Sequence, residues 1–152
     1  MKNYRIRQFG PETVDTDQIT ELNVHFFPYS PWLEFENTHW FIAYDGGAPW
    51  TNPMAFAGVQ FLEGEAFLCR CAVGPQFRNK GLQRTFIRKR TQLCAANGIK
   101  NIYTYTSVDN VASMRNLISN KFRPCHFPGK HWIGTYLDSG EEYVYWKKEY
   151  EL

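Results

Sequence analysis

The sequence lacks the features that mark membrane, secreted or zinc-binding proteins. No run in its 152 residues approaches the roughly 20 consecutive apolar residues that span a bilayer. Residues 1–5 have no apolar core of a secretion signal. The cysteines, Cys69, Cys71, Cys94 and Cys125, include no second pair at zinc spacing. We therefore expect a cytoplasmic protein with reduced thiols, no metal and no membrane partner.

The sequence also has no large excess of positive or negative charge. Seventeen basic and fifteen acidic residues leave a net charge of +2, so no strong field favours nucleic acid. Four basic residues occur close together, but helical spacing spreads them around the axis instead of along one face. They are Arg84, Arg88, Lys89 and Arg90. We expect no nucleic acid as partner, and the length indicates one domain over residues 1–152.

The apolar pattern predicts strands and helices in one mixed fold. Strands are expected at 4–9, 39–44, 54–62, 65–73 and 102–107, and a final hairpin at 132–136 and 143–147. Helices are expected after Asp15, over 82–96, and after Asn110. Helices between the later strands imply a mixed sheet with crossover connections.

Residues 65–73 are apolar on both faces, which predicts a central strand covered on both sides. Simple alternation places Phe67, Cys69, Cys71 and Val73 on one face. Arg70, on the other face, is the only charged residue inside this strand.

The helix expected over 82–96 has one apolar arc with a single charged residue in it. The apolar members are Leu82, Phe86, Ile87, Leu93 and Cys94. Arg90 falls inside this arc, and we expect its charged end to reach the edge of the protein.

The most informative stretch is the loop that joins this strand to the helix. It ends in Arg78-Asn79-Lys80-Gly81, and the helix begins immediately afterwards. Backbone N–H groups from Asn79 to Arg84 can therefore face one spot at the positive end of the helix dipole. Basic side chains add charge there, and a diphosphate fits such a spot. The alternative is an ordinary glycine loop with solvated charges.

These features together resemble the GCN5-related N-acetyltransferase superfamily. Residues 78–83 resemble its acyl-CoA loop, Gln/Arg-x-x-Gly-x-Gly/Ala, with Gln83 in place of the small residue. Val73-Gly74-Pro75 resembles an upstream Val-x-Pro, and residues 110–113 resemble a downstream Asn-x-x-Ser/Ala. The resemblance implies an α+β fold. Its central mixed sheet is twisted and mostly antiparallel, has about seven strands, and carries helices on both faces.

The resemblance also implies an N-acyltransferase that uses acetyl-CoA or another acyl-CoA as co-substrate. A primary amine of a small molecule or a protein would attack the thioester directly. The implied cofactor-binding residues are Val73, Arg78, Asn79, Lys80, Gly81, Leu82, Gln83, Arg84, Asn110 and Ser113. A backbone N–H near Val73 would stabilise the oxyanion. Gln83 would either turn its side chain aside or donate to a phosphate.

The catalytic side chains that the resemblance implies are replaced. Leu117 stands where many members have a tyrosine, and Tyr105 stands where some have a glutamate. Tyr105 is our catalytic candidate, to protonate the thiolate or orient a water; alternatively it only packs on the sheet. Glu65 is a second candidate base, or the solvated start of a strand. These replacements leave open a catalytically idle relative that binds CoA or a partner protein.

Acceptor recognition in this superfamily usually involves the first inter-helix loop and the terminal hairpin. The corresponding residues here are Tyr29, Trp32, Glu34, Glu36, His131, Trp132 and Tyr136. Carboxylates and rings suit a cationic amine, and they equally suit an ordinary aromatic surface. The sequence therefore identifies neither the acceptor nor the acyl chain, and it leaves monomer and homodimer open.

Overall fold

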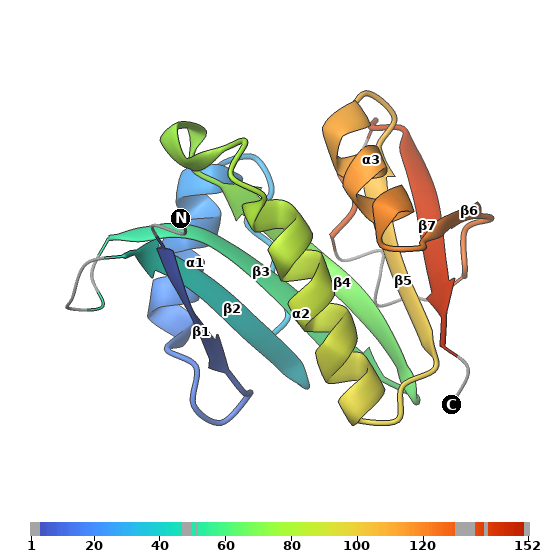
Figure 1. The fold of residues 1–152 in the computed structure, drawn as a ribbon, viewed down its shortest axis with the longest axis horizontal. Helices are drawn as coiled ribbons and strands as arrows, with labels where there is room; N and C mark the ends of the chain where they lie inside the picture. Colours follow the sequence, from blue (N-terminus) through green and yellow to red (C-terminus); the bar gives the residue numbers. More distant parts are fainter. Residues whose placement is uncertain (1–3, 47–49, 51, 130–135, 139, 151–152) are drawn as a thin grey trace.

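The protein folds around one open seven-stranded sheet in the order β1-β2-β3-β4-β5-β7-β6. A computed structural model describes residues 4–46, 50, 52–129, 136–138 and 140–150 (Figure 1). The strands are β1 (Tyr4–Phe9), β2 (Thr38–Asp45), β3 (Pro53–Leu62), β4 (Glu65–Val73), β5 (Asn101–Ser107), β6 (Arg123–Cys125) and β7 (Tyr143–Glu149). Among the described strands, only β4 and β5 pair in parallel. The expected mixed, mostly antiparallel sheet is confirmed.

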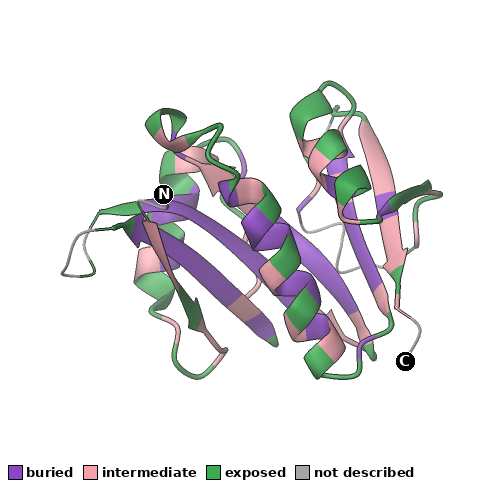
Figure 2. Cartoon of the chain, in the orientation of Figure 1, coloured by how far each residue is buried: buried purple, intermediate pink, exposed green. Residues whose placement is uncertain are grey.

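Helices cover both faces of this sheet, as expected. They are α1 (Thr16–Phe26), α2 (Leu82–Ala96) and α3 (Val111–Ser119), with a 3₁₀ turn, η1 (Pro75–Phe77). Helix α2 crosses one face and α1 lies behind the other (Figure 1). Phe86 and Ile87 of α2 pack in one core, and Ile19 of α1 packs with Trp40 in the other. The central strands are buried along most of their length (Figure 2), because they carry apolar side chains on both faces.

The helices begin and end at residues that favour those boundaries. The Asp15 carboxylate accepts hydrogen bonds from the N–H groups of Asp17 and Gln18, which caps α1 as expected. After α2, Gly98 has a φ of +71°, a conformation that glycine adopts without strain.

A bulge in β4 changes which way its side chains face. Ala57 pairs with Cys71 and the next residue, Gly58, pairs with Cys69, so Arg70 is an extra residue with a φ of +44°. Beyond it, Cys71 and Val73 pack on the α2 side, whereas Cys69 packs on the α1 side. The simple alternation expected for residues 65–73 is therefore wrong after Arg70, because one inserted residue reverses the remaining faces.

The C-terminal edge of the sheet differs in part from the expected hairpin. Strand β7 confirms its second half. Its first half, 132–136, lies outside the described residues except for Tyr136, which is in a turn. At this edge β7 pairs with β6, a short strand that we did not expect, in which Pro124 pairs with Trp146. Proline is tolerated there because β6 is an edge strand.

Strands β4 and β5 separate soon after they meet. Only Ala66–Ile102 and Phe67–Tyr103 pair across them. The strands then diverge toward the start of α2 and toward α3 (Figure 1). This divergence creates the space for a site.

Candidate functional site

Two connected hollows lie where β4 and β5 diverge. The outer cleft, of about 770 Å³, lies between the end of β4, the start of α2 and the start of α3. The inner cavity, of about 350 Å³, lies against β4, β5, α2, α3 and the side chains of Asp138, Glu141 and Tyr143. Cys71, Gln83, Asn110 and Ser113 line both. One elongated ligand can therefore occupy the two hollows together.

The start of α2 presents unpaired backbone donors to the outer cleft. Gly81 is the N-cap with a φ of +72°, and no side chain caps the helix. Among the described residues, nothing accepts from the N–H groups of Leu82, Gln83 and Arg84. Asn79 also has a positive φ, of +63°. Unpaired N–H groups at the positive end of a helix dipole favour an anion.

The basic side chains predicted for this loop lie in different places. Arg78 and Arg84 line the outer cleft, and Arg78 Nε donates to the Val73 carbonyl at 3.2 Å. Lys80 lies over the Phe77 ring, 5.8 Å from its centre, and is not part of the cleft wall. Two of the three predicted cations are thus placed beside the unpaired amides.

Gln83 bridges α2 and α3 across the boundary of the two hollows. Its Nε2 donates to Ser113 Oγ at 2.7 Å, and Asn116 Nδ2 donates to its Oε1 at 2.7 Å. Asn110 caps α3 by accepting from the Ser113 N–H at 3.1 Å. The side chain of Gln83 is therefore turned aside, which is one of the two alternatives that the sequence left open.

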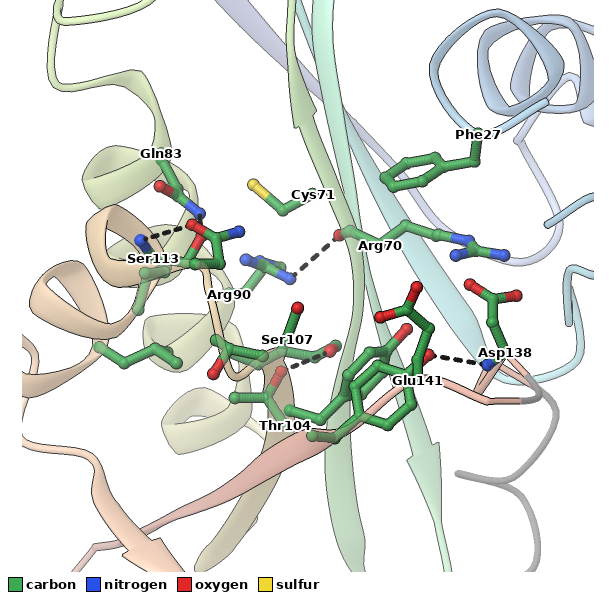
Figure 3. Close-up of a pocket in the computed structure, with 17 residues that line it drawn as sticks. Phe27, Arg70, Cys71, Gln83, Arg90, Thr104, Ser107, Ser113, Asp138 and Glu141 are labelled. Atoms are coloured by element: carbon green, nitrogen blue, oxygen red, sulfur yellow. Dashed lines mark hydrogen bonds between the residues drawn. The ribbon is translucent and has the colours of Figure 1, made fainter. Parts of the chain in front are cut away.

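The inner cavity combines a polar strand end with a buried apolar position (Figure 3). Residues 104–107 of β5 form one wall, and Asp138, Glu141 and Tyr143 form another. Sequence reasoning did not identify this second wall, because only the fold brings it to β5. Leu117 lines the cavity and is 4% exposed. It stands at the position where many members of the superfamily that the sequence resembles carry a tyrosine. That position thus faces the cavity without offering a hydroxyl.

Tyr105 lines the inner cavity, but its hydroxyl proton is already engaged in a hydrogen bond within the protein. Its hydroxyl donates to the Tyr136 carbonyl at 3.0 Å, and its ring stacks on Phe67. Burial raises the pKa of Tyr105 far above its usual value, so the hydroxyl stays protonated. Glu65, the second candidate base, is at the opposite end of β4, beside Tyr103. It lines neither hollow.

Arg90 is buried in the core, and the expectation that it reaches the edge is wrong. Its side chain is 3% exposed. Nη1 donates to the Gly58 carbonyl at 3.0 Å and to the Arg70 carbonyl at 3.4 Å. Nε donates to the Phe86 carbonyl at 3.2 Å. These carbonyls, two of them beside the bulge, retain the guanidinium inside the protein and against the inner cavity.

Arg70 extends from the bulge to the α1 side of the sheet, where it fixes the loop between α1 and β2. Its Nη2 donates to the carbonyls of Ser30 and Trp32, at 2.7 and 3.1 Å. Tyr136 supports the same loop, because the Glu34 N–H donates to its hydroxyl at 2.9 Å. The sequence did not indicate this role for Arg70, which depends on the bulge.

The residues proposed for acceptor recognition are only partly placed. Tyr29 and Trp32 are exposed, by 96% and 66%, whereas Tyr136 is buried. The backbone carbonyl of Glu36 accepts from Thr38 and Gln60. His131 and Trp132 lie outside the described residues.

Two other kinds of site have no candidate within the described ranges. They contain no group of three or more histidine, cysteine, aspartate or glutamate side chains arranged to hold a metal ion. None of their helices combines the length and hydropathy needed to cross a membrane.

Comparison with known proteins gives the same fold. The chain is similar to the ribosomal-protein-S18-alanine N-acetyltransferase of Escherichia coli, with 18% identity, a TM-score of 0.72, and coverage of 97% of this chain and 96% of the other. It is also similar to a Bacillus subtilis acetyltransferase in complex with CoA, with 13% identity, a TM-score of 0.71, and coverage of 97% and 99%. Arabidopsis thaliana NAA60, in complex with a bisubstrate analogue, gives 15% identity, a TM-score of 0.68, and 97% coverage of both chains.

Comparison by sequence gives a match to a family model. No curated protein matches the chain significantly. The model of the acetyltransferase (GNAT) family matches residues 5–117, a span that includes the start of α2, the diverging strands and most of α3. The chain belongs to the acetyltransferase (GNAT) family.

Proposed function

We propose that this protein is an acyl-CoA-dependent N-acyltransferase that uses acetyl-CoA and transfers the acyl group to a primary amine. One observation carries the proposal: the unpaired amides at the start of α2 face a cleft that shares its lining residues with a second, adjoining cavity. Family membership supports it, and solved structures of the same fold hold CoA or acetyl-CoA.

In this proposal the outer cleft binds the nucleotide end of the co-substrate. The N–H groups of residues 82–84 donate to the diphosphate, and Arg78 and Arg84 balance its charge. Asn79, Gly81 and Leu82 shape the turn, while Lys80 contributes charge from outside the cleft wall. Asn110 and Ser113 flank the passage to the inner cavity.

The thioester then lies where the two hollows meet, with its carbonyl oxygen toward Val73 of the outer cleft and its sulfur toward the inner cavity, which receives the amine. The backbone N–H near Val73 stabilises the oxyanion of the tetrahedral intermediate. Tyr105 positions a water or the incoming amine through the free lone pairs of its hydroxyl, since its proton is donated to Tyr136. The amine must arrive neutral, although a lysine-like amine has a pKa of about 10.4. Asp138 and Glu141 face the cavity, and they favour the approach of a cationic amine before it loses its proton.

A second candidate function is a protein that binds CoA without transferring the acyl group. Leu117 favours it, because an apolar side chain stands where a hydroxyl acid is expected. Release of CoA thiol across a panel of amines and peptides separates the two. Transfer predicts thiol release with at least one acceptor above the hydrolysis rate, and binding alone predicts none.

A charge placed at the start of α2 tests the binding site. Gly81→Glu should lower acetyl-CoA affinity by roughly 100-fold or more, since a carboxylate would compete for the donors and repel the diphosphate. An added Cβ at Gly81 meets no atom within 4 Å, and the strain that its positive φ imposes on a glutamate is shared by the control variant below. Isothermal calorimetry measures the affinity.

Gly98→Glu is the matched control for this experiment. Gly98 has nearly the same φ, +71°, and equally open surroundings, but it lies at the other end of α2. The control should bind acetyl-CoA with wild-type affinity. Equal affinities of the two variants would remove the proposed site, and no binding by the wild type would remove the proposed function.

A further inference from the structure

A positive charge is buried in the core at a position where the helix otherwise presents apolar side chains. Arg90 is 3% exposed, and its neighbours in the apolar arc of α2 are Phe86, Ile87 and Cys94. Burying a charged group is costly unless it is compensated. The compensation comes from carbonyl oxygens, and no carboxylate among the described residues pairs with Arg90. An arginine remains protonated in such a place.

One side of this guanidinium remains available to a ligand. Nε and Nη1 donate to carbonyls, whereas Nη2 has no hydrogen-bond partner among the described residues. Nη2 is not one of the fully buried atoms that lack a partner, so it faces the inner cavity that Arg90 lines. Figure 3 shows the Arg90 side chain between Cys71 and Ser107, toward the middle of this cavity.

The groups around Arg90 do not neutralise it. Its titratable neighbours are the thiols of Cys69 and Cys71 on β4 and of Cys94 on α2. Burial raises the pKa of all three thiols, so they are uncharged near neutral pH. Tyr105 on β5 is also neutral, and the carboxylates of the cavity, Asp138 and Glu141, belong to its other wall. Arg70 also lines the cavity, but its Nη2 donates to the carbonyls of Ser30 and Trp32. An anion in the cavity would therefore meet two arginines, with Arg90 as the cation on the α2 side.

The proposed function places a sulfur atom in this cavity. Arg90 lies nine residues after Gly81, or about 13 Å along the helix. An extended pantetheine arm that starts from a diphosphate at residues 82–84 covers this distance. It passes Gln83 and Ser113 and enters the cavity beside Cys71, which lines both hollows.

We propose that Arg90 stabilises the CoA thiolate that leaves when the acyl group is transferred, a task that Leu117 is chemically unable to perform. The inference rests on the proposed function. The amine nitrogen forms a bond to the acyl carbon, the carbon–sulfur bond breaks, and its electron pair stays on sulfur as a thiolate beside Nη2. The nitrogen of the tetrahedral intermediate loses its extra proton to water in the cavity, which leaves a neutral amide. Arg90 keeps its own proton throughout.

The thiol of bound CoA provides a test that needs no acceptor. A cation within about 4–6 Å lowers the pKa of an acid by roughly 1 or more, and an ordinary thiol has a pKa of about 8.5. We expect CoA bound to the wild type to ionise at least about 1 pH unit below free CoA. The ultraviolet absorbance of the thiolate measures this ionisation, with the complex of desulfo-CoA as blank to remove the protein's own thiols.

Three variants separate the charge of Arg90 from its packing. Arg90→Gln keeps a donor for the Gly58 carbonyl but removes the charge, so the pKa of bound CoA should return to that of free CoA or rise above it. Arg90→Lys should retain most of the lowering. Lys89→Gln, which removes one positive charge from the neighbouring position of the helix, should leave it unchanged. Thermal unfolding confirms that each variant is folded.

The outcomes distinguish this inference from the proposed function. If CoA binds and its thiol ionises as in free solution, or equally in wild type and Arg90→Gln, Arg90 has only a structural role and the inference fails alone. If CoA does not bind to the wild type, both fail. Should Arg90→Gln not fold, the comparison of wild-type-bound with free CoA still decides.

Discussion

The outer cleft and the inner cavity are built from different kinds of group. The outer cleft depends on the backbone: a left-handed glycine, a helix start without a side-chain cap, and N–H groups that donate to no described residue. The inner cavity depends on side chains, which come from β4, β5, α2 and α3 and from Asp138, Glu141 and Tyr143. Backbone donors remain when side chains change, so binding of the shared co-substrate tolerates sequence drift. Side-chain chemistry does not, and it is in the inner cavity that this chain departs most from the pattern of its family.

Shortening the co-substrate should produce the largest effect. Acetyl-pantetheine keeps the thioester and the arm but lacks the diphosphate. Each hydrogen bond to a charged group contributes about 1.5–3 kcal/mol, so losing two of them predicts binding weaker by about 10²- to 10⁴-fold. Competition against acetyl-CoA measures the difference. Similar affinity for the two compounds would mean that the inner cavity, and not the outer cleft, provides the binding energy.

High pH should weaken the fold through Cys69, which lies beneath the bulge. Burial raises its pKa from 9.0 to about 11. The unfolded chain therefore loses this proton at lower pH than the folded chain does. The contribution of Cys69 to the free energy of unfolding is fully present below about pH 9. It falls by roughly 2 kcal/mol as the pH rises to about 11.

Urea unfolding of wild type and Cys69→Ala across this pH range measures the Cys69 contribution. The variant should be less stable at pH 8, because it leaves a cavity, but its stability should fall less steeply with pH. Parallel curves for the two proteins would show that Cys69 is not the group responsible.

Gln83 tests whether the boundary between the two hollows belongs to binding or to folding. Gln83→Ala removes two hydrogen bonds to α3, which should cost about 1 kcal/mol of stability. Acetyl-CoA affinity should change by less than about threefold, because the amide is already engaged with Ser113 and Asn116. A tenfold loss of affinity would instead show that Gln83 turns to donate to a phosphate.

Tyr105→Phe should have the smallest effect. The ring keeps its stacking on Phe67 and loses only the hydroxyl that donates to Tyr136. We expect turnover to fall by about threefold, the effect of losing one weak hydrogen bond that positions a water or the amine. A positioned acid or base typically contributes about 10²–10⁴ in rate, so a decrease of that size would make Tyr105 the proton donor and would weaken the case for Arg90.

The sequence predicts most of the fold because its local patterns agree with one another. Glycine and proline turns, capping residues such as Asp15 and two-sided apolar strands place nearly every element. The exceptions have physical causes. The bulge at Arg70 depends on pairing between β3 and β4, which alternation within one strand does not contain. Strand β6 is too short for a period to be recognised.

The site divides in the same way. The start of α2 is readable in sequence, because Arg78-x-x-Gly81 and the following helix determine where the amides point. The position of Arg90 is not, since a charged residue in an apolar arc more often reaches solvent than the interior. The carbonyls of Gly58 and Arg70 that retain it inside come from separate strands, and only the folded chain brings them together.

Amide chemical shifts on titration with CoA test the central claim most directly. The claim is that backbone N–H groups at the start of α2 hold the diphosphate. It predicts that the amides of Gln83 and Arg84 show the largest shifts in the ¹H–¹⁵N spectrum, and that acetyl-pantetheine does not reproduce them. CoA binding that leaves these amides unshifted, with the changes elsewhere, would contradict the claim.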